Sequence, residues 1–366
     1  MDSHKVIDLR SDTVTKPSAD MRKAIYESVV GDNCYNEDPS VTELEKLAAK
    51  LVGKERALFV SSGTMSNLVA VMTHCWERGS EILLGDQAHI HINELGGIAT
   101  VASVHHRTLT NNSDGTFSID ELVAKIRNKG VYPNPTLICL ENTHNICNGS
   151  PLPLEFIDEV CRIAKQHNLS VHMDGARIFN ASLKTGVPVP RILRDCDSVS
   201  FCLSKGLGCP VGSLLCGSNE FIERAWICRY MLGGAMRQSG ILASAGLYAL
   251  NNNIDRLAID HKHALMISSA IAKHDKSYIR VTVKNIHTNI VYITTDPNWM
   301  TGPQFVNRLN TITEEERTVL GDRCVVVKMG SRSATKIRFV THLDITADDI
   351  ELVIEKLNFI INNNNQ

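Results

Sequence analysis

The segment Val199-Ser-Phe-Cys-Leu-Ser-Lys205-Gly-Leu-Gly-Cys-Pro210 ends an apolar run with a single lysine, which has a serine before it and glycines after it. The apolar residues predict a buried strand, and Lys205 follows where this strand ends. A lysine in such a place either extends its ammonium group to solvent or loses its proton and attacks an aldehyde. The segment alone leaves both interpretations open, so the surrounding sequence has to decide between them.

Strand-like and helix-like segments alternate around this lysine. Periodic apolar residues predict strands at 136–142, 169–174, 197–203 and 212–216, and a helix at 153–168. This alternation predicts an α/β fold with a mostly parallel sheet flanked by helices. The last two strands are close enough in sequence to form a hairpin, so we expect an antiparallel element in a mixed sheet.

The length of 366 residues suggests about two domains, and a hydrophobic content of 43% is enough for a large core. We predict an N-terminal arm over residues 1–16, a large domain over 17–250 and a smaller C-terminal α+β domain over 251–366. A helix over about 251–276 is predicted to link the last two parts.

Composition excludes several classes of protein. The net charge is -2, aromatic residues make up 5%, and no basic patch with interleaved aromatic residues is present, so we expect no nucleic-acid partner. No apolar run reaches the ~18 residues of a membrane span, and the N-terminus lacks a signal or transit pattern. Eleven cysteines without a C-x-x-C pair indicate reduced thiols. We therefore expect a cytoplasmic protein without membrane contact or a metal site.

A second stretch, Leu58-Phe-Val-Ser-Ser-Gly-Thr-Met-Ser-Asn67, has the pattern of an anion site. A strand runs into a turn of small residues and then into a helix. The first backbone N–H groups of a helix have no partner within it, and the helix dipole favours a negative charge there. Ser62, Gly63 and Thr64 could therefore hold a phosphate group. The alternative is an ordinary Ser or Thr cap of the helix.

A third stretch, His172-Met-Asp174-Gly-Ala-Arg177, places a carboxylate at the carboxyl end of a strand, where open α/β sheets bind ligands. A buried Asp174 needs a cationic partner, which is either a protonated heterocyclic nitrogen or Arg177. A phosphate site, a strand-end Asp and a strand-end Lys are together what pyridoxal 5'-phosphate (PLP) requires, because the Lys forms the Schiff base and the Asp keeps the ring nitrogen protonated. A metal site fits less well, since His89 and His91 lack carboxylate partners at ligand spacing.

The motifs of the chain together resemble those of the low-specificity L-threonine aldolases, which have the PLP-dependent fold type I of aspartate aminotransferase. The resemblance extends from about residue 5 to residue 358. Its motifs are Ile7-Asp-Leu-Arg-Ser-Asp-Thr-Val-Thr-Lys-Pro17, Ser62-Gly-Thr-Met-Ser-Asn67, Leu140-Glu-Asn-Thr-His-Asn145, His172-Met-Asp-Gly-Ala-Arg177, Leu203-Ser-Lys-Gly-Leu-Gly208 and Arg338-Phe-Val-Thr-His342.

The resemblance implies a set of residues that hold the cofactor. Lys205 is the Schiff-base lysine, and Asp174 pairs with the pyridine nitrogen. Ser62, Gly63 and Thr64 lie at the phosphate. Three further residues complete the set: His89 stacks on the cofactor ring, Arg177 lies near its phenolic oxygen, and Arg237 reaches the cofactor of the neighbouring subunit.

The resemblance also implies residues that bind the substrate. Ser11 and Arg338 grip the amino-acid carboxylate, which suits a fork-shaped guanidinium, and Arg177 lies near the same group. His144 lies near the β-hydroxyl, although a lone histidine is often only a polar residue with satisfied hydrogen bonds. Tyr35 comes across the dimer interface. We therefore expect a homo-oligomer, a tetramer built from dimers whose active sites are shared between subunits.

The implied reaction is the cleavage of L-threonine, L-allo-threonine or a related L-β-hydroxy-α-amino acid to glycine and an aldehyde, which is acetaldehyde for threonine. His89, His144 or a water takes the proton of the β-hydroxyl. Two alternatives stay open. One is another PLP enzyme of fold type I, either a β-eliminating lyase or an aminotransferase. The other is a cofactor-free oligomeric pseudoenzyme, against which the intact Lys205 and Asp174 argue.

Overall fold

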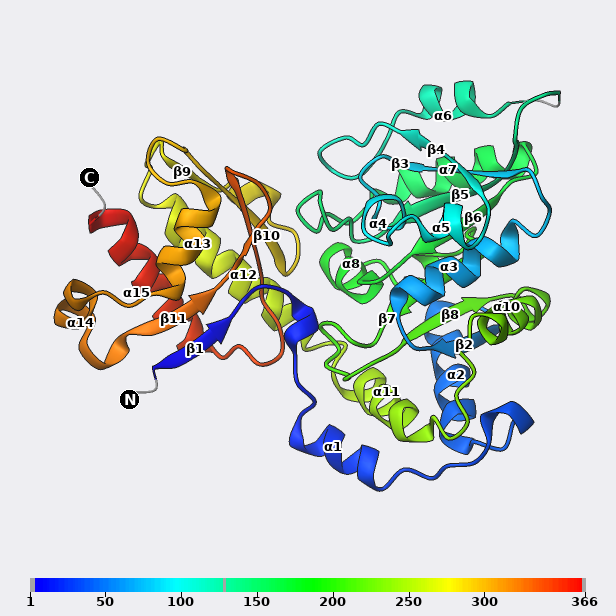
Figure 1. Cartoon of the computed structure of the whole chain (residues 1–366), viewed down its shortest axis with the longest axis horizontal. Coiled ribbons are helices and arrows are strands. Elements are labelled where there is room, and N and C mark those ends of the chain that lie inside the picture. Colours follow the sequence, from blue (N-terminus) through cyan, green and yellow to red (C-terminus); the bar gives the residue numbers. More distant parts are fainter. Residues whose placement is uncertain (1–3, 128–129, 364–366) are drawn as a thin grey trace. The chain divides into compact units, whose positions relative to one another are not determined.

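The structure, a computed structural model, describes residues 4–127 and 130–363 and contains two compact units (Figure 1). The large unit runs from Lys16 to Asp255. The small unit combines the N-terminal segment up to Thr15 with the chain from Arg256 onward. The domain boundaries expected from the sequence, 16/17 and 250/251, stay predictions.

The large unit contains a seven-stranded sheet flanked by helices. Its strands are β2 (Arg56–Val60), β3 (Ser80–Gly85), β4 (His105–Leu109), β5 (Asn134–Glu141), β6 (Ser170–Asp174), β7 (Ser198–Cys202) and β8 (Ser213–Gly217). Its helices are α1 (Ala19–Tyr26), α2 (Pro39–Val52), α3 (Gly63–His74), α4 (His89–Ile92), α5 (Gly97–Thr100), α6 (Ile119–Lys125), α7 (Leu154–Gln166), α8 (Ile178–Thr185), α9 (Val189–Ile192), α10 (Asn219–Met231) and α11 (Gly240–Asn252), with a 3-10 turn at Asn33–Tyr35.

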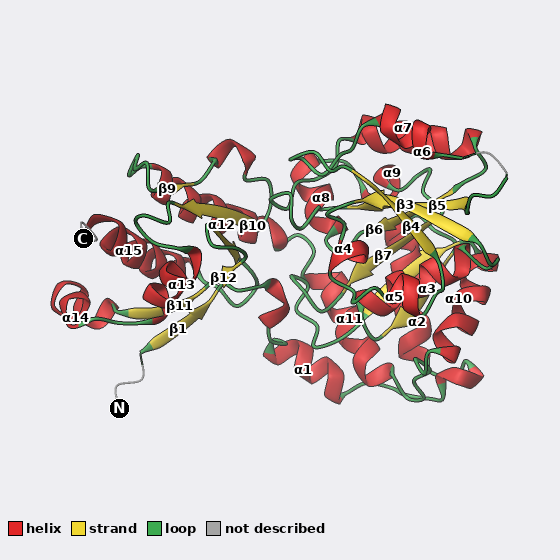
Figure 2. Ribbon diagram, turned by 45° about the horizontal axis from the view of Figure 1, so that its top comes forward, coloured by secondary structure: helices red, strands yellow, loops and turns green. Residues whose placement is uncertain are grey.

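The strands of this sheet follow the order β2-β8-β7-β6-β5-β3-β4. Strand β8 runs antiparallel to both its neighbours, and the other pairs are parallel. The predicted β7–β8 hairpin and the predicted mixed sheet are therefore confirmed. Every residue of β3, β7 and β8 is buried, as expected for a sheet covered on both faces. Helix α3 packs across β5 to β8, and α7 packs on β6 from the opposite face (Figure 2).

The face of the sheet that meets α3 is apolar at its sides and polar at its centre. Strands β2 and β8 pack apolar residues against α3 and α10, and β3 and β5 pack theirs against the end of α3. Between them, β6 and β7 present polar side chains at alternate positions, in register with one another. With two polar residues of α3 these form what we call the polar seam: Asn67, His74, His172, Asp174, Ser198 and Ser200. Buried polar groups are tolerated only when they are hydrogen-bonded, so the seam has to be bonded internally.

The small unit is an α+β unit with two sheets. Its strands are β1 (Lys5–Asp8), β9 (Ile279–Arg280), β10 (Ile290–Thr295), β11 (Val325–Lys328), β12 (Gly330–Ser331) and β13 (Lys336–Val340). Its helices are α12 (Leu257–Ala272), α13 (Gly302–Asn310), α14 (Glu314–Leu320) and α15 (Ala347–Asn363), with 3-10 turns at Asp12–Val14, Val283–Asn285 and Gly321–Arg323. Four strands pair antiparallel in the order β12-β13-β10-β9. None of the helices in the described ranges is long and apolar enough to cross a membrane.

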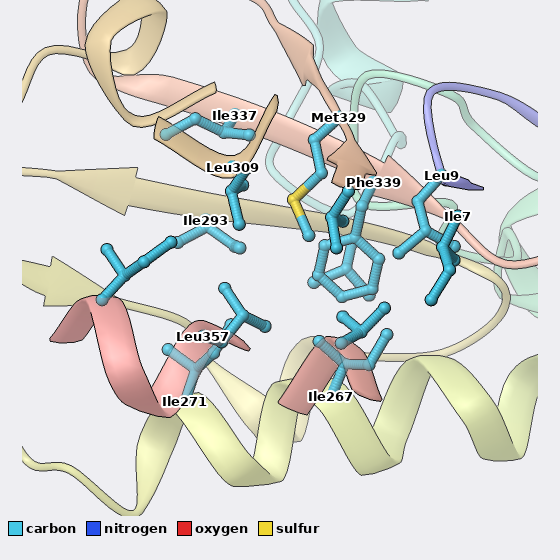
Figure 3. Packing of buried hydrophobic residues seen from close by; sticks show 14 of the residues in the cluster. Ile7, Leu9, Ile267, Ile271, Ile293, Leu309, Met329, Ile337, Phe339 and Leu357 are labelled. Carbon is cyan, nitrogen blue, oxygen red and sulfur yellow. The ribbon is translucent and has the colours of Figure 1, made fainter. Parts of the chain in front are cut away.

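The start of the chain is built into the small unit. Strand β1 pairs in parallel with β11, so Lys5 lies opposite Val325. Ile7 and Leu9 are buried in a core that they share with apolar residues of α12, α13, β10, β13 and α15 (Figure 3). The structure thus packs this segment into the small unit, because its two apolar residues have a core to enter.

The helix predicted over 251–276 is divided in the structure. Helix α11 ends at Asn252, and α12 begins only at Leu257. The side-chain amides of Asn251 and Asn252 each donate to the carbonyl oxygen four residues earlier, over 2.9 and 2.7 Å. Asparagine side chains compete in this way with backbone hydrogen bonding, which favours the end of a helix. The prediction of one continuous linking helix was therefore wrong.

A buried ion cluster ties together the helices of the small unit. Lys356 Nζ donates to Glu316 Oε1 over 2.8 Å and to the carbonyl oxygens of Thr311 and Val325 over 2.8 and 2.6 Å. Arg308 Nη1 donates to the other oxygen of Glu316 over 2.8 Å. The side chains of Lys356 and Glu316 are fully buried. Burial lowers the pKa of Lys356, and the carboxylate of Glu316 opposes this shift.

Removing the carboxylate should leave a buried ammonium group without its ionic partner. We expect Glu316→Ala to lower the free energy of unfolding by about 3–5 kcal/mol, measured by urea denaturation followed by circular dichroism. The triple variant Glu316→Leu/Lys356→Met/Arg308→Met is the matched control, because it replaces all three charges of the cluster with apolar groups. It should recover most of the loss. Equal destabilisation of the two variants would show that the unpaired charge is not the cause.

Candidate active site

Four parallel strands end at the same edge of the large sheet, and a polar residue stands at or after each end. Strand β7 leads to Lys205, β6 ends at Asp174, β5 ends at Glu141, and β3 leads to His89. Ligands of open α/β sheets bind at this carboxyl edge. The structure therefore brings three residues predicted from the sequence, Lys205, Asp174 and His89, to one edge of the large unit.

Lys205 stands in a tight turn after β7. The N–H of Gly208 donates to the carbonyl oxygen of Lys205 over 2.8 Å, and its φ of 82° lies in the left-handed region that favours glycine. The side chain of Lys205 is half-buried. Within residues 4–127 and 130–363, its amine has no hydrogen-bond or ion-pair partner. An amine held at a strand end without a partner is available for a covalent bond to a ligand.

Asp174 is buried, with 3% of its surface exposed. One carboxylate oxygen accepts a hydrogen bond from the side-chain amide of Asn67 over 2.9 Å, and the other accepts from the N–H of Ala176 over 3.1 Å. Both donors are neutral amides, so they orient the carboxylate without neutralising its charge. A buried carboxylate in this state favours a positively charged ligand group.

His89 and Glu94 form a pair beside Asp174. His89 Nδ1 lies 2.9 Å from Glu94 Oε1, and ligand atoms of His89, Glu94 and Asp174 lie within 4.8 Å of one another. Burial would lower the pKa of His89, but its hydrogen bond to Glu94 and the charge of Asp174 outweigh burial, so the pKa is raised. Burial, reinforced by the charge of Asp174, raises the pKa of Glu94. Two carboxylates and one imidazole in a confined space attract a cation, either a metal ion or a protonated heterocycle.

Glu141 connects the two segments that carry the predicted histidines. Its carboxylate accepts from the backbone N–H of His89 over 2.7 Å and from that of Asn145 over 2.8 Å. His144 is 2% exposed, and neither of its ring nitrogens has a hydrogen-bond partner among the described residues. A buried imidazole in this state is suited to bind a polar ligand group. A role for His144 at the substrate stays a prediction.

The first turn of α3 is arranged as the sequence predicted for a phosphate site. Ser62 caps the helix, and its hydroxyl accepts from the N–H of Met65 over 3.1 Å. The N–H groups of Gly63 and Thr64 have no partner in the described part of the chain and can donate to an anion. A Cβ atom on Gly63 would lie 2.7 Å from Cys202 Sγ, so glycine lets α3 begin against the end of β7. The helix cap by Ser62 is confirmed, and it leaves two donors available, so the phosphate site stays a prediction.

Tyr35 and Arg237 lie on two neighbouring surface segments. The N–H of Asn33 donates to the carbonyl oxygen of Arg237 over 2.7 Å, and Arg237 Nη1 lies 3.5 Å from Asp32 Oδ2. Tyr35 is 73% exposed. Among the residues that the structure describes, no hydrogen bond or ion pair joins either side chain to the strand-end residues. A contribution of Tyr35 and Arg237 to the active site of a neighbouring subunit stays a prediction.

Ser11 and Arg338 belong to the small unit and lie close together there. Arg338 is buried, and its Nη2 donates to the carbonyl oxygen of Arg10 over 3.1 Å. The hydroxyl of Ser11 accepts from the backbone N–H two residues later over 3.3 Å. Arg177 is buried in the large unit and directly precedes α8. The roles of these three residues toward a substrate or cofactor stay predictions.

Sequence reasoning missed three residues of the site: Asn67, Glu94 and Glu141. Asn67 and Glu141 lie within quoted motifs, and each is a polar residue in an otherwise buried element. That combination is a usable signal, because buried polar side chains have specific partners. Glu94 follows a short helix in an irregular segment, where no periodicity marks it.

Comparison with known proteins decides the family. The family described as Beta-eliminating lyase matches residues 8–296. The chain belongs to this family. It is 44% identical over 351 residues to "Low-specificity L-threonine aldolase 1" of Arabidopsis thaliana, covering 95% of this chain and 94% of the relative. It is 40% identical over 346 residues to "Low specificity L-threonine aldolase" of Escherichia coli K12, covering 94% and 96%.

A solved structure agrees with this assignment at the level of the fold. The threonine aldolase of Leishmania major superposes with a TM-score of 0.79 at 16% sequence identity, covering 97% of this chain and 99% of that one. The predicted resemblance to the low-specificity L-threonine aldolases and the predicted PLP-dependent fold type I are therefore confirmed. As a member of the beta-eliminating lyase family, the chain is a PLP-dependent enzyme.

The residues at the carboxyl edge fit PLP. Lys205 offers an unengaged amine for the aldehyde, and the first turn of α3 offers two N–H groups for the phosphate. The carboxylate of Asp174, whose two hydrogen-bond donors are neutral amides, suits a protonated pyridine ring. The two orphan nitrogens of His144 remain for a polar group of the substrate.

The raised pKa of His89 gives a direct test of this charge balance. In Glu94→Gln the carboxylate is lost, so burial should dominate and the pKa of His89 should fall. The measurement is an NMR titration of the carbon-13-labelled histidines, with the His89 signal assigned from a His89→Gln variant. Glu77→Gln, on the exposed surface, is the control and should leave the midpoint unchanged. A midpoint that stays in place in Glu94→Gln would remove Glu94 as the source of the shift.

Proposed function

We propose that the protein is a PLP-dependent aldolase that cleaves L-threonine, L-allo-threonine and related L-β-hydroxy-α-amino acids to glycine and an aldehyde. The observation that carries this proposal is the position of Lys205, Asp174 and the first turn of α3 at one edge of the sheet. The relatives named as low-specificity L-threonine aldolases support the choice of substrate.

Each strand-end residue has a part in holding the cofactor. Lys205 would form the covalent bond to the aldehyde carbon, and Asp174 would accept the hydrogen bond of the protonated ring nitrogen. Ser62, Gly63 and Thr64 would bind the phosphate. His89 would contact the cofactor ring, Arg177 its phenolic oxygen, and Arg237 would reach it from the neighbouring subunit. When bound, PLP accepts the electron pair that is released at the substrate Cα atom.

The chain's own residues move the protons of the reaction. A base takes the proton of the β-hydroxyl as the Cα–Cβ bond breaks and the aldehyde leaves, and the Cα atom then takes up a proton to become glycine. His144 is the favoured base, because neither of its buried ring nitrogens is hydrogen-bonded to a residue within 4–127 or 130–363. His89 is less suited to act as the base, because its Nδ1 already contacts Glu94 Oε1. A water held between the histidines is the third candidate.

Ser11 and Arg338 are proposed to bind the amino-acid carboxylate. A guanidinium group binds a carboxylate in a planar, paired geometry, which fixes the direction of the bond that breaks. Arg338 is already held in place through the carbonyl oxygen beside Ser11, which supports a preformed site. Tyr35 is proposed to reach the substrate from a neighbouring subunit.

We further propose a homotetramer built from two dimers. Residues 26–35 meet the segment after α10 through the hydrogen bond between Asn33 and Arg237. Large apolar side chains are exposed on these segments, a feature that is typical of surfaces that contact another protein. They are Tyr26, Val29, Tyr35 and Met231.

A cytoplasmic location and a part in threonine breakdown and glycine formation belong to the same proposal. All eleven cysteines are free, and only Cys34 is more than slightly accessible. Free thiols in this number are typical of a reducing compartment.

Another PLP reaction is the second candidate function, because the matched family is described as a beta-eliminating lyase. β-Elimination or amino transfer would use the same lysine and aspartate. Product analysis separates the reactions: aldol cleavage of threonine releases glycine and acetaldehyde, whereas the alternatives release ammonia or a keto acid. A protein that cannot take up PLP would instead support a pseudoenzyme.

Lys205→Ala should abolish the reaction, because it removes the amine that is proposed to bind the cofactor aldehyde. We expect acetaldehyde formation from L-threonine to fall by at least about two orders of magnitude, measured with a coupled alcohol dehydrogenase assay. Lys184→Ala, which removes an exposed lysine of α8, is the control and should retain full activity. Full turnover by Lys205→Ala would rule out the assignment.

His144→Ala tests the identity of the base. If His144 takes the β-hydroxyl proton, kcat for threonine cleavage should fall by about 10²–10⁴-fold, while PLP uptake stays unchanged. His144→Asn keeps a polar side chain without a basic nitrogen and should be equally slow. Unchanged cleavage by both variants would transfer the role to His89 or to a water.

A further inference from the structure

The polar seam contains more bonded polar groups than the proposed reaction uses. His74 and Asn67 stand on the same face of α3, and the seam residues of β6 and β7 stand opposite them. All six residues are joined in one continuous set of hydrogen bonds. This set begins at the end of α3 and reaches Asp174.

Asn67 is the junction of the seam. Its Nδ2 donates to Asp174 Oδ2 and to Glu94 Oε1, each over 2.9 Å. Its Oδ1 accepts from the hydroxyl of Ser200 over 2.7 Å and lies 3.2 Å from His172 Nε2. The orientation of the amide follows from this environment, because a carboxylate can only accept and a flipped amide would put its oxygen against both carboxylates.

The donors and acceptors in the rest of the seam can be assigned in only one way. His172 Nε2 has to carry the proton, since it faces the Asn67 oxygen, so Nδ1 of a neutral ring accepts from the hydroxyl of Ser198 over 2.8 Å. The Ser198 oxygen then accepts from His74 Nε2 over 2.7 Å. Burial lowers the pKa of His172 to about 4, against the charge of Asp174. Burial lowers the pKa of His74 to about 3, so both rings are neutral near pH 7.

Every donor in this series therefore points toward Asp174 and Glu94. Each hydrogen bond determines whether the next group donates or accepts, so the side-chain amide of Asn67 has a single stable orientation. With the N–H of Ala176 on its other oxygen, Asp174 is held from both sides. Hydrogen bonds to the charged form of a carboxylate stabilise that form.

We propose that Asn67 is a positioning residue that holds the carboxylate of Asp174 aimed at the ring nitrogen of PLP. Ser200 and His172 orient Asn67, and Ser198 and His74 orient His172. The inference rests on the proposed function, because it requires Asp174 to meet the ring nitrogen. It adds that this contact depends on residues of α3 and β7 that need not touch the cofactor.

The test uses PLP labelled with nitrogen-15 in its ring, bound to the full-length protein. The ring-nitrogen chemical shift reports whether the nitrogen is protonated, and fluorescence titration gives the Kd for PLP. We expect Asn67→Ala to decrease the protonated fraction of the ring nitrogen and to raise the Kd about tenfold, which corresponds to about 1.4 kcal/mol. Thr73→Val, a buried substitution on the same helix outside the seam, should change neither value.

Asp174→Ala separates this inference from the proposed function. If Asp174→Ala shifts both values and a folded Asn67→Ala shifts neither, Asn67 has only a structural role and the inference is wrong. If Asp174→Ala shifts neither value, the proposed role of Asp174 fails instead. Circular dichroism establishes folding. If Asn67→Ala does not fold, Ser200→Ala decides, because it removes one hydrogen bond that orients the amide. We then expect a smaller shift in the same direction, and wild-type values would overturn the inference.

Discussion

The buried carboxylate of Asp174 is the constraint on which the active site depends. A carboxylate with 3% exposure is stable only if donors replace water, and the chain supplies two neutral amides for it. Burial, reinforced by the charge of Asp174, raises the pKa of Glu94, and the hydrogen bond to Glu94 raises the pKa of His89 against the effect of burial. The donors of Asp174 carry no positive charge, and a cofactor with a protonated ring would supply one.

The architecture delivers the remaining groups to the same place. Parallel strands end together, so residues far apart in the sequence, such as His89 and Lys205, share one edge. Gly63 has no side chain to collide with Cys202, which lets the anion-binding end of α3 lie against the end of β7. Glu141 then links the segments of His89 and His144 through their backbone N–H groups. Rigid elements therefore position most of the groups that chemistry needs.

The residues proposed to take part in the chemistry were easier to detect in the sequence than the residues that contact them. Lys205 and Asp174 stand at the ends of apolar strands, where a charged residue is conspicuous. Asn67 escaped notice because its partners come from three other segments of the chain, and Glu94 because its segment has no periodicity. The helix expected over 251–276 was drawn from apolar spacing alone, which does not register the local bonding of Asn251 and Asn252.

The most direct test of this account is the position of the covalent bond between protein and cofactor. The protein is incubated with PLP, reduced with borohydride, digested and mapped by mass spectrometry. The account predicts that the phosphopyridoxyl group is found on Lys205 and that an Asp174→Ala variant carries less of it at the same PLP concentration. A label on another lysine, or none on Lys205 after saturation with PLP, would contradict the account.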